Sequence, residues 1–173
     1  GVDTILGPEM KSTGEVMGVG LSFSEAFVKS QLAANVRLPN SGQVFISVKE
    51  SDKPKAVNIA RELQAAGFTL IATRGTAAAI AAAGIAVTAV NKVTEGRPNI
   101  VDMIKNNEIA LVINTVEERR NAIADSRYIR TSALLGRVTT FTTIAGAEAA
   151  VEGMKYLDQL DVISVQEMHA QLA

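Results

Sequence analysis

From Gln43 onward, short apolar segments alternate with segments of helical character, and this alternation constrains the fold more than any other feature. Strands that alternate with helices through tight loops form a parallel sheet with helices on both faces. We therefore predict an α/β protein: a three-layer α/β/α arrangement around a five-stranded parallel sheet. The predicted strands are Val44–Val48, Phe68–Ala72, Ile85–Val90, Ile109–Ile113 and Val138–Thr143.

The helices between these strands are predicted from capping residues and apolar spacing. Ser51 or Asp52 can cap a helix that has Pro54 in its first turn and ends at Gly67. The Thr73–Thr76 segment leads into an alanine helix that stops at Gly84, and the others are Pro98–Asn106, Glu117–Leu135 and Ala145–Leu157. An earlier helix is expected at Leu21–Leu32, capped by Ser22 or Ser24, with Phe23, Phe27 and Val28 as its apolar stripe. Ala34–Gly42 reads as a linker.

Composition excludes several classes of function. The chain has 173 residues, no cysteine, one histidine (His169) and a net charge of −1. Disulfides, thiolate metal sites, cysteine nucleophiles and multi-histidine sites cannot be built from it. Acidic and basic residues are interspersed, which argues against a general nucleic-acid or membrane surface. With no run of ~20 apolar residues and no signal peptide, we expect a cytoplasmic protein without a metal site.

Polar side chains follow every predicted strand, at the sheet edge where open α/β folds bind ligands. They include hydroxyls, amides and lysines, with few carboxylates. By strand, they are Ser47, Lys49 and Lys53; Thr73, Arg74, Gly75 and Thr76; Asn91, Lys92 and Thr94; Asn114 and Thr115; Thr142 and Thr143.

The Thr73–Thr76 loop is the sharpest of these signals. Two hydroxyls flank Gly75 at a helix start, where free N–H groups and the helix dipole favour an anion. Lysines from neighbouring loops could add charge-assisted hydrogen bonds. A phosphate cradle is one interpretation, and a simple capped helix start is the other. The loop is neither a Walker motif nor a dinucleotide fingerprint.

Longer motifs identify the chain as resembling a known family. Leu6–Gly18 resembles the segment that closes the second ATP-grasp half of carbamoyl phosphate synthetase large subunits. Matches to the same family continue in order along almost the whole chain: Thr73–Thr76, Val90–Val93, Glu95–Asn99, Ile113–Thr115, Asp125–Ser126, Ile129–Arg130 and Ser164–His169.

The resemblance implies a fold, a function and a set of contacts. The fold is methylglyoxal synthase-like, and the family's C-terminal domain binds UMP as inhibitor and IMP as activator. Lys53, Thr73, Gly75 and Thr76 are then expected at the effector phosphate, and Ser47, Lys92, Asn114 and Thr115 along the nucleoside. The parent enzyme uses ATP and Mg to make carbamoyl phosphate for arginine and pyrimidine synthesis, with a glutaminase small subunit. No cofactor is expected in this domain.

The resemblance also divides the chain and leaves alternatives. Residues 1–40 would be a remnant of the preceding synthetase domain plus a linker, less firmly anchored than the regulatory domain at 41–173. Thr140-Phe141-Thr142 aligns with the family's ornithine contact, where an aspartate is missing, so Thr142 is a weak candidate. The chain itself is expected to be catalytically inactive. A methylglyoxal synthase-type lyase and a nucleotide-binding adaptor without a parent enzyme are the alternatives.

Overall fold

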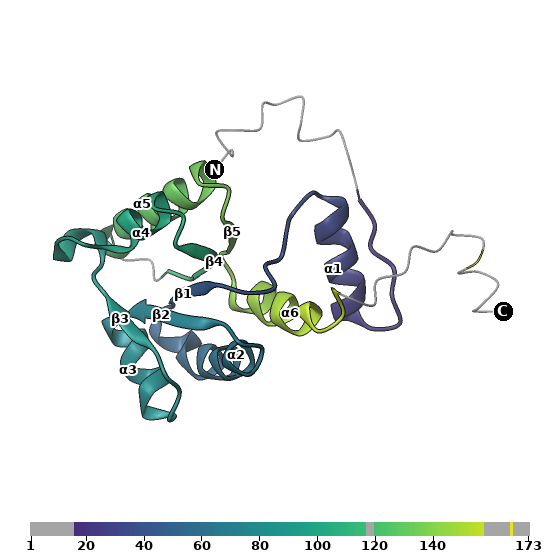
Figure 1. Ribbon diagram of the computed structural model, residues 1–173, viewed down its shortest axis with the longest axis horizontal. Helices are drawn as coiled ribbons and strands as arrows, with labels where there is room; N and C mark the ends of the chain where they lie inside the picture. The colour runs from purple at the N-terminus through teal and green to yellow at the C-terminus, as the bar shows by residue number, and fades with distance from the viewer. Residues whose placement is uncertain (1–15, 117–119, 158–166, 168–173) are drawn as a thin grey trace.

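A computed structural model describes residues 16–116, 120–157 and 167 (Figure 1). Helices and strands alternate as the sequence predicts. The strands are β1 (Gln43–Ser47), β2 (Thr69–Thr73), β3 (Thr88–Val90), β4 (Ile109–Asn114) and β5 (Thr139–Phe141). The α-helices are α1 (Phe23–Ala33), α2 (Lys53–Ala65), α3 (Arg74–Ala82), α4 (Ile100–Lys105), α5 (Arg120–Leu135) and α6 (Ile144–Met154). Two 3₁₀ turns, η2 (Glu50–Asp52) and η3 (Val93–Glu95), follow β1 and β3.

The strands form one five-stranded parallel sheet in the order β3-β2-β1-β4-β5. Phe45 of β1 lies opposite Ile71 of β2 and Val112 of β4, so β1 is central. The edge strands are shorter than predicted. β3 pairs with β2 only from Thr88, and the preceding Ile85 is buried in the core without pairing. The predicted fold class is confirmed.

Helices cover both faces of the sheet, which gives the three layers (Figure 1). One face packs side chains of α1, α2, α3 and α6 against residues such as Val44 and Leu111. The other packs Ile100 and Ile104 of α4 and Ile129 of α5 around Phe45. Neighbouring residues of a strand point to opposite faces, so an apolar run such as Val44–Ile46 supplies both cores.

Two details of the predicted helix starts are wrong. Phe23 was expected in the apolar stripe of α1 together with Phe27 and Val28, yet it is 73% exposed, whereas Val28 is fully buried as expected. Ser22 caps this helix by accepting a hydrogen bond from Glu25 N, and Ser24 is buried. At α2, Asp52 occupies the N-cap without a side-chain hydrogen bond. Asp52 is the last residue of η2, so its backbone is helical (φ −95°). A capping residue usually has an extended backbone, and Asp52 does not.

Helix α1 packs on α6 through a close approach of the two backbones. A Cβ added at Gly153 of α6 would lie 2.0 Å from Val28 Cγ2 and 3.0 Å from Ser24 O. Val28 is fully buried, so α1 is anchored to the domain rather than loosely attached. The expected boundary between residues 1–40 and 41–173 stays a prediction, but weak anchoring does not describe residues 23–33.

Replacing Gly153 by alanine should therefore loosen α1. Alanine raises intrinsic helix propensity, so α6 alone would become more stable. The clash with Val28 should instead weaken α1 docking by about 1 kcal/mol or more. Hydrogen exchange of the α1 amides is the measurement, with Glu152→Ala on the exposed side of α6 as the control. Unchanged exchange across α1 in Gly153→Ala would contradict this packing.

Several sequence predictions lie outside the described residues. They are most of the Leu6–Gly18 motif, the Ser164–His169 motif except Glu167, the start of the Glu117–Leu135 helix, and His169. Within the described part of the chain, no helix is long and apolar enough to cross a membrane.

Candidate functional site

Three hydroxyl side chains meet where β1 and β2 end. Thr73 Oγ1 lies 3.1 Å from Ser47 Oγ and 3.4 Å from Thr76 Oγ1. Thr76 Oγ1 also accepts a hydrogen bond from Val48 N (3.2 Å). Thr73 and Thr76 are both buried. Two strand ends and one helix start are thus tied together by hydroxyls, and the structure brings Ser47, Thr73 and Thr76 together as the sequence predicts.

The start of α3 lacks a side-chain cap. Ser22, Asn99 and Thr143 each accept hydrogen bonds from first-turn N–H groups of α1, α4 and α6, whereas Thr73 at the N-cap of α3 accepts none. The Thr73 hydroxyl is directed to Ser47 instead. The first-turn N–H groups of α3, like those of α2, are therefore left without a side-chain cap, and free N–H groups of this kind favour an anionic ligand.

Lys53 brings a positive charge to the same place. A Cβ at Gly75 would lie 3.6 Å from Lys53 Nζ, so the ammonium lies over the first turn of α3. The absence of a side chain at Gly75 keeps this space open. Lys53 is paired with Glu50 at 2.6 Å, and the side chains are 22% and 76% exposed, respectively. Lys53 and Gly75 thus join the hydroxyl cluster, and Glu50 places a carboxylate beside it.

Asn114, at the end of β4, is held by a buried network. Its Oδ1 accepts hydrogen bonds from Ser126 Oγ and from Arg130 Nε (3.1 Å), and its backbone oxygen accepts one from Arg130 Nη2 (2.8 Å). Burial lowers the pKa of the Arg130 guanidinium. Both oxygens of Asn114 thus accept hydrogen bonds, and its side-chain amide donates one to Ser47 O (3.4 Å) at the end of β1.

The residues that hold Asn114 were not predicted as part of the site. Ser126, Arg130 and Ala133 lie on the inward face of α5, which also carries Ile129. A serine and an arginine in an otherwise apolar stripe are the signal that could have identified them, because buried polar groups need partners.

A small cavity of about 90 Å³ opens between the ends of β1 and β4. Thr115 stands on its wall and accepts a hydrogen bond from Lys49 N (3.1 Å). Lys92 reaches the same cavity from the loop after β3. The remaining lining residues are Ser47, Val48, Lys49, Asn114, Val116, Asp125, Ser126 and Ile129. The predicted nucleoside residues Ser47, Lys92, Asn114 and Thr115 therefore all line one cavity.

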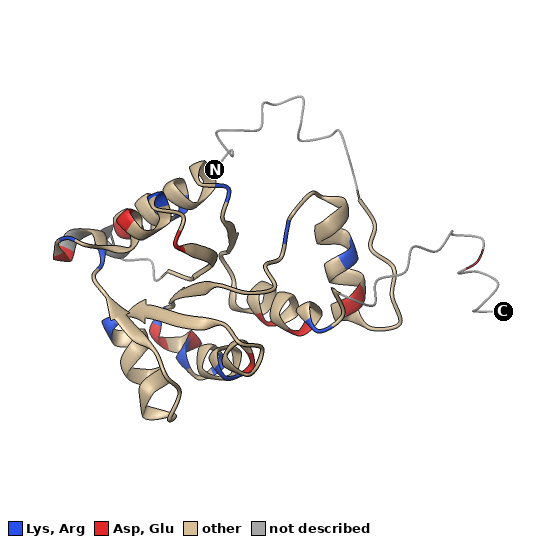
Figure 2. Cartoon of the chain, viewed as in Figure 1, with Lys and Arg blue, Asp and Glu red and all other residues tan. Residues whose placement is uncertain are grey.

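Arg74 points away from this cavity toward the loop after β3. Its Nη2 donates to Asn91 Oδ1 (3.1 Å), and its Nε lies 4.0 Å from Glu95 Oε2. Lysines and arginines are interspersed with acidic residues along α2 and α5 (Figure 2). Among the described residues, no three His, Cys, Asp or Glu side chains form a group that could hold a metal ion.

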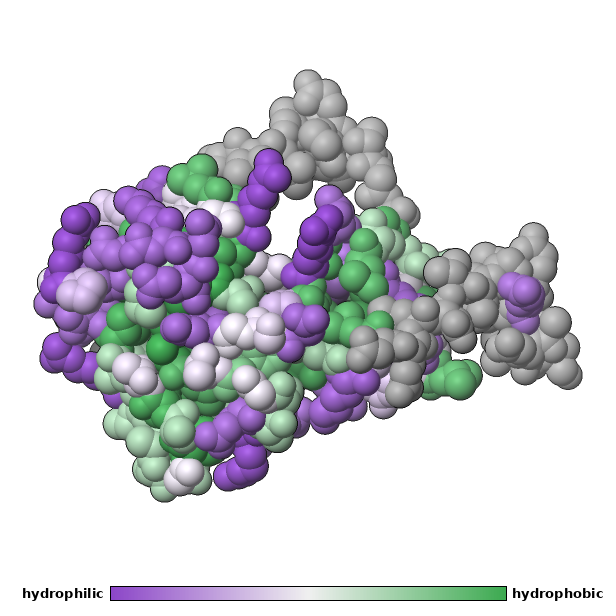
Figure 3. Space-filling view, in the orientation of Figure 1, coloured by the Kyte–Doolittle hydropathy of each residue, from purple (hydrophilic) through white to green (hydrophobic). Residues whose placement is uncertain are grey.

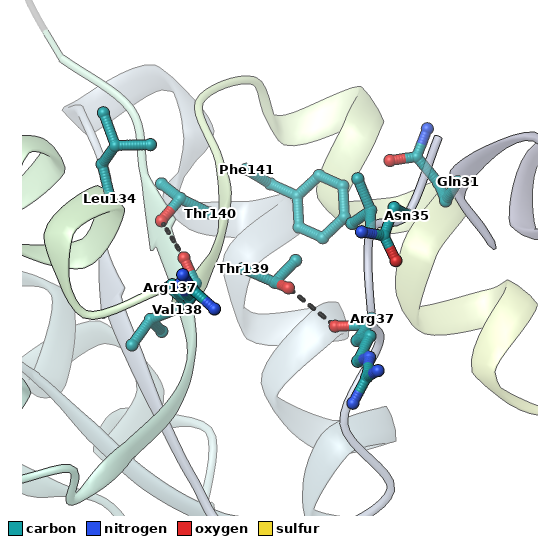
Figure 4. A pocket seen from close by; sticks show the side chains of 10 residues that line it. Gln31, Asn35, Arg37, Leu134, Arg137, Val138, Thr139, Thr140 and Phe141 are labelled. Atoms are coloured by element: carbon teal, nitrogen blue, oxygen red, sulfur yellow. Dashed lines mark hydrogen bonds between the residues drawn. The ribbon is translucent and has the colours of Figure 1, made fainter. Parts of the chain in front are cut away.

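A larger hollow of about 830 Å³ lies beside β5 and shares no lining residue with the small cavity. It is lined by Gln31, Asn35, Val36, Arg37, Leu134, Arg137, Val138, Thr139, Thr140 and Phe141 (Figure 4). It separates the α1 side of the molecule from the α5 side (Figure 3). Thr139 Oγ1 donates to Arg37 O across it (2.7 Å). None of the described residues that line it is a carboxylate, and Thr142 is exposed outside it. Its described lining therefore offers no acidic partner for the ammonium groups of ornithine.

Comparison with known proteins identifies the family of this chain. Residues 55–142 match the family described as the MGS-like domain. The chain is 64% identical over 172 residues to the carbamoyl phosphate synthase large chain of Ralstonia nicotianae. It is 55% identical over 172 residues to that of Pasteurella multocida and 57% over 170 residues to that of Pseudomonas aeruginosa. These matches cover 98–99% of this chain but only 16% of each relative.

Proposed function

Because the chain belongs to the MGS-like domain family, we propose that it is the effector-binding regulatory region of a carbamoyl phosphate synthase large chain. Its ligand would be a nucleoside monophosphate such as UMP or IMP. The observation that carries the proposal is the uncapped start of α3, with Lys53 above it and the hydroxyls of Thr73 and Thr76 beside it.

The phosphate would lie at the first turn of α3. A phosphate monoester brings close to two negative charges and several acceptor oxygens near pH 7. Free N–H groups, hydroxyls and one ammonium are the donors that such a group requires. The ribose and base would extend toward Lys92, Asn114 and Thr115, which line the adjoining cavity. That cavity is small, so we expect the nucleoside to lie partly across the open strand edge.

The chain spans only 16% of the length of its relatives, so catalysis would belong to protein outside it. We propose that the parent enzyme uses ATP and Mg there, together with a glutaminase small subunit. Ornithine would also need partners from that region, since neither Thr142 nor the described lining of the hollow beside β5 supplies a carboxylate. A lyase has less support: the start of α3 is surrounded by hydroxyls and Lys53, which suit phosphate binding, and no aspartate directly follows Thr73–Thr76 in the sequence.

Regulation requires that the effector bind the active and inactive states with different affinities. The test is to measure UMP affinity of the full-length enzyme with and without saturating ATP. We expect the two dissociation constants to differ by about fivefold or more, as typical allosteric coupling implies. Equal values would mean that nucleotide binding here transmits no signal to the ATP sites.

Binding should also depend on pH through the ligand. The second pKa of a phosphate monoester is about 6, and the proposed site favours the dianion. Affinity should be fully present above this pKa and fall as pH drops below it, by about tenfold between pH 7 and pH 5. Calorimetry of UMP at both values is the measurement. A nucleoside 5′-sulfate, whose charge is constant over this range, is the control. A UMP affinity independent of pH would contradict the dianion site.

A further inference from the structure

Lys53, the residue expected to bind the effector phosphate, forms an ion pair with a carboxylate of the protein. Lys53 Nζ lies 2.6 Å from Glu50 Oε2. Glu50 is the first residue of η2, three positions before Lys53, and its carboxylate therefore lies at the same sheet edge as the start of α3. A second pair, Arg74 with Glu95, stands on the far side of α3, but its atoms are 4.0 Å apart. Glu50 is thus the carboxylate paired with the lysine that is expected to meet the phosphate.

The two members of this pair differ in exposure. Lys53 is 22% exposed and keeps its position over Gly75, whereas Glu50 is 76% exposed. The glutamate side chain already lies largely in solvent, while the lysine is held near α3. An exposed ion pair contributes little to stability, so a ligand with two negative charges can displace it.

We propose that Glu50 is an internal competitor for the effector phosphate and sets the affinity of the site. This inference rests on the proposed nucleotide site. In the free protein, Glu50 neutralises Lys53; when a phosphate binds, the carboxylate leaves Lys53 and turns toward solvent. Each binding event then includes the loss of one ion pair. The carboxylate also stays near enough to repel the bound dianion, and that repulsion is weakened by salt.

The experiment measures UMP binding by calorimetry in three proteins: wild type, Glu50→Gln and Glu148→Gln. Glutamine keeps the size of the side chain and removes its charge. Glu148 is the matched control, because it pairs with Lys55 of the same helix α2 at 3.1 Å but on the α6 side. Glu50→Gln should bind UMP about three- to fivefold more tightly than wild type, as expected for removal of a surface ion pair. Glu148→Gln should bind like wild type.

Salt supplies a second readout that a structural role of Glu50 would not change. Without the competing carboxylate, the local site is more positive, so UMP affinity should fall more steeply with salt in Glu50→Gln than in wild type. The melting temperatures of both variants should match that of wild type to within about 2 °C, because Glu50 is exposed and Glu148 is only partly buried.

The outcomes separate this inference from the proposed function. If wild type binds UMP and Glu50→Gln binds it equally or more weakly, the competitor role is wrong and the nucleotide site stands. If wild type fails to bind UMP but Glu50→Gln binds it, Glu50 is the competitor and the wild-type chain is not an effector site on its own. If neither protein binds UMP, both proposals are overturned.

Discussion

Replacing Lys53 by alanine is expected to weaken UMP or IMP binding by about ten- to a hundredfold. A hydrogen bond to a charged group contributes roughly 1.5–3 kcal/mol, and each ~1.4 kcal/mol is tenfold in affinity. Lys53 is the ammonium nearest the α3 start, given that a Cβ at Gly75 would lie 3.6 Å from its Nζ. Thr76→Val should have an effect of similar size, since it removes a hydroxyl at the same turn.

The controls distinguish the loss of a lysine at the proposed phosphate site from the loss of one positive charge elsewhere on the domain. Lys55→Ala removes a lysine from the same helix, and Lys155→Ala removes one from the end of α6; their partners are Glu148 and Glu62. Both should bind UMP like wild type. Thr76→Val needs a stability measurement beside it, because Val48 N loses its hydrogen-bond acceptor. If Lys53→Ala binds UMP as tightly as Lys55→Ala does, the phosphate does not meet Lys53.

Replacing Arg130 by methionine should destabilise the fold by about 1.5–3 kcal/mol. Methionine keeps the apolar stem of the side chain but removes the donors to Asn114 Oδ1 and to Asn114 O. Asn114 is buried, so its oxygens would lose partners that water replaces poorly. For a chain of this length, the melting temperature should fall by several degrees. Urea unfolding followed by circular dichroism is the measurement.

Arg127→Met is the matched control on the same helix. Arg127 is exposed, and surface substitutions usually change stability by no more than about 0.5 kcal/mol. Arg130→Lys should recover only part of the loss, because an ammonium cannot reproduce two N–H groups in a fixed plane. Equal stability of Arg130→Met and Arg127→Met would show that the Asn114 network contributes nothing to folding.

The strands of the sheet could be predicted because each is marked by the residues of its own short segment. Runs such as Ile109–Ile113 are long enough and apolar enough to be strands buried on both faces, and the intervening helices imply parallel pairing. Strand order does not follow from such patterns. It places β1 in the centre, so that residues after β1, β2 and β4 become neighbours. The predicted site residues meet because of this strand order, and the strand order cannot be deduced from the spacing of residues along the chain.

The parts that were not predictable depend on contacts between distant segments. Phe23 and Val28 both belong to the apolar stripe of α1 in the sequence. The packing of α1 on α6 buries Val28 and leaves Phe23 in solvent. The ion pair of Glu50 with Lys53 depends on the η2 turn, which replaces the simple cap expected at Asp52. Arg130 was visible only as part of a family motif, because its role requires β4 to lie beside α5.

The central claim is that this chain recognises the phosphate of a nucleotide at the start of α3. Calorimetric titration of the purified chain with UMP and with uridine tests it most directly. We predict that UMP binds with measurable affinity and that uridine binds at least about a hundredfold more weakly, because it lacks the group that meets Lys53, Thr73 and Thr76. Equal binding of uridine and UMP, or no binding of UMP, would contradict it.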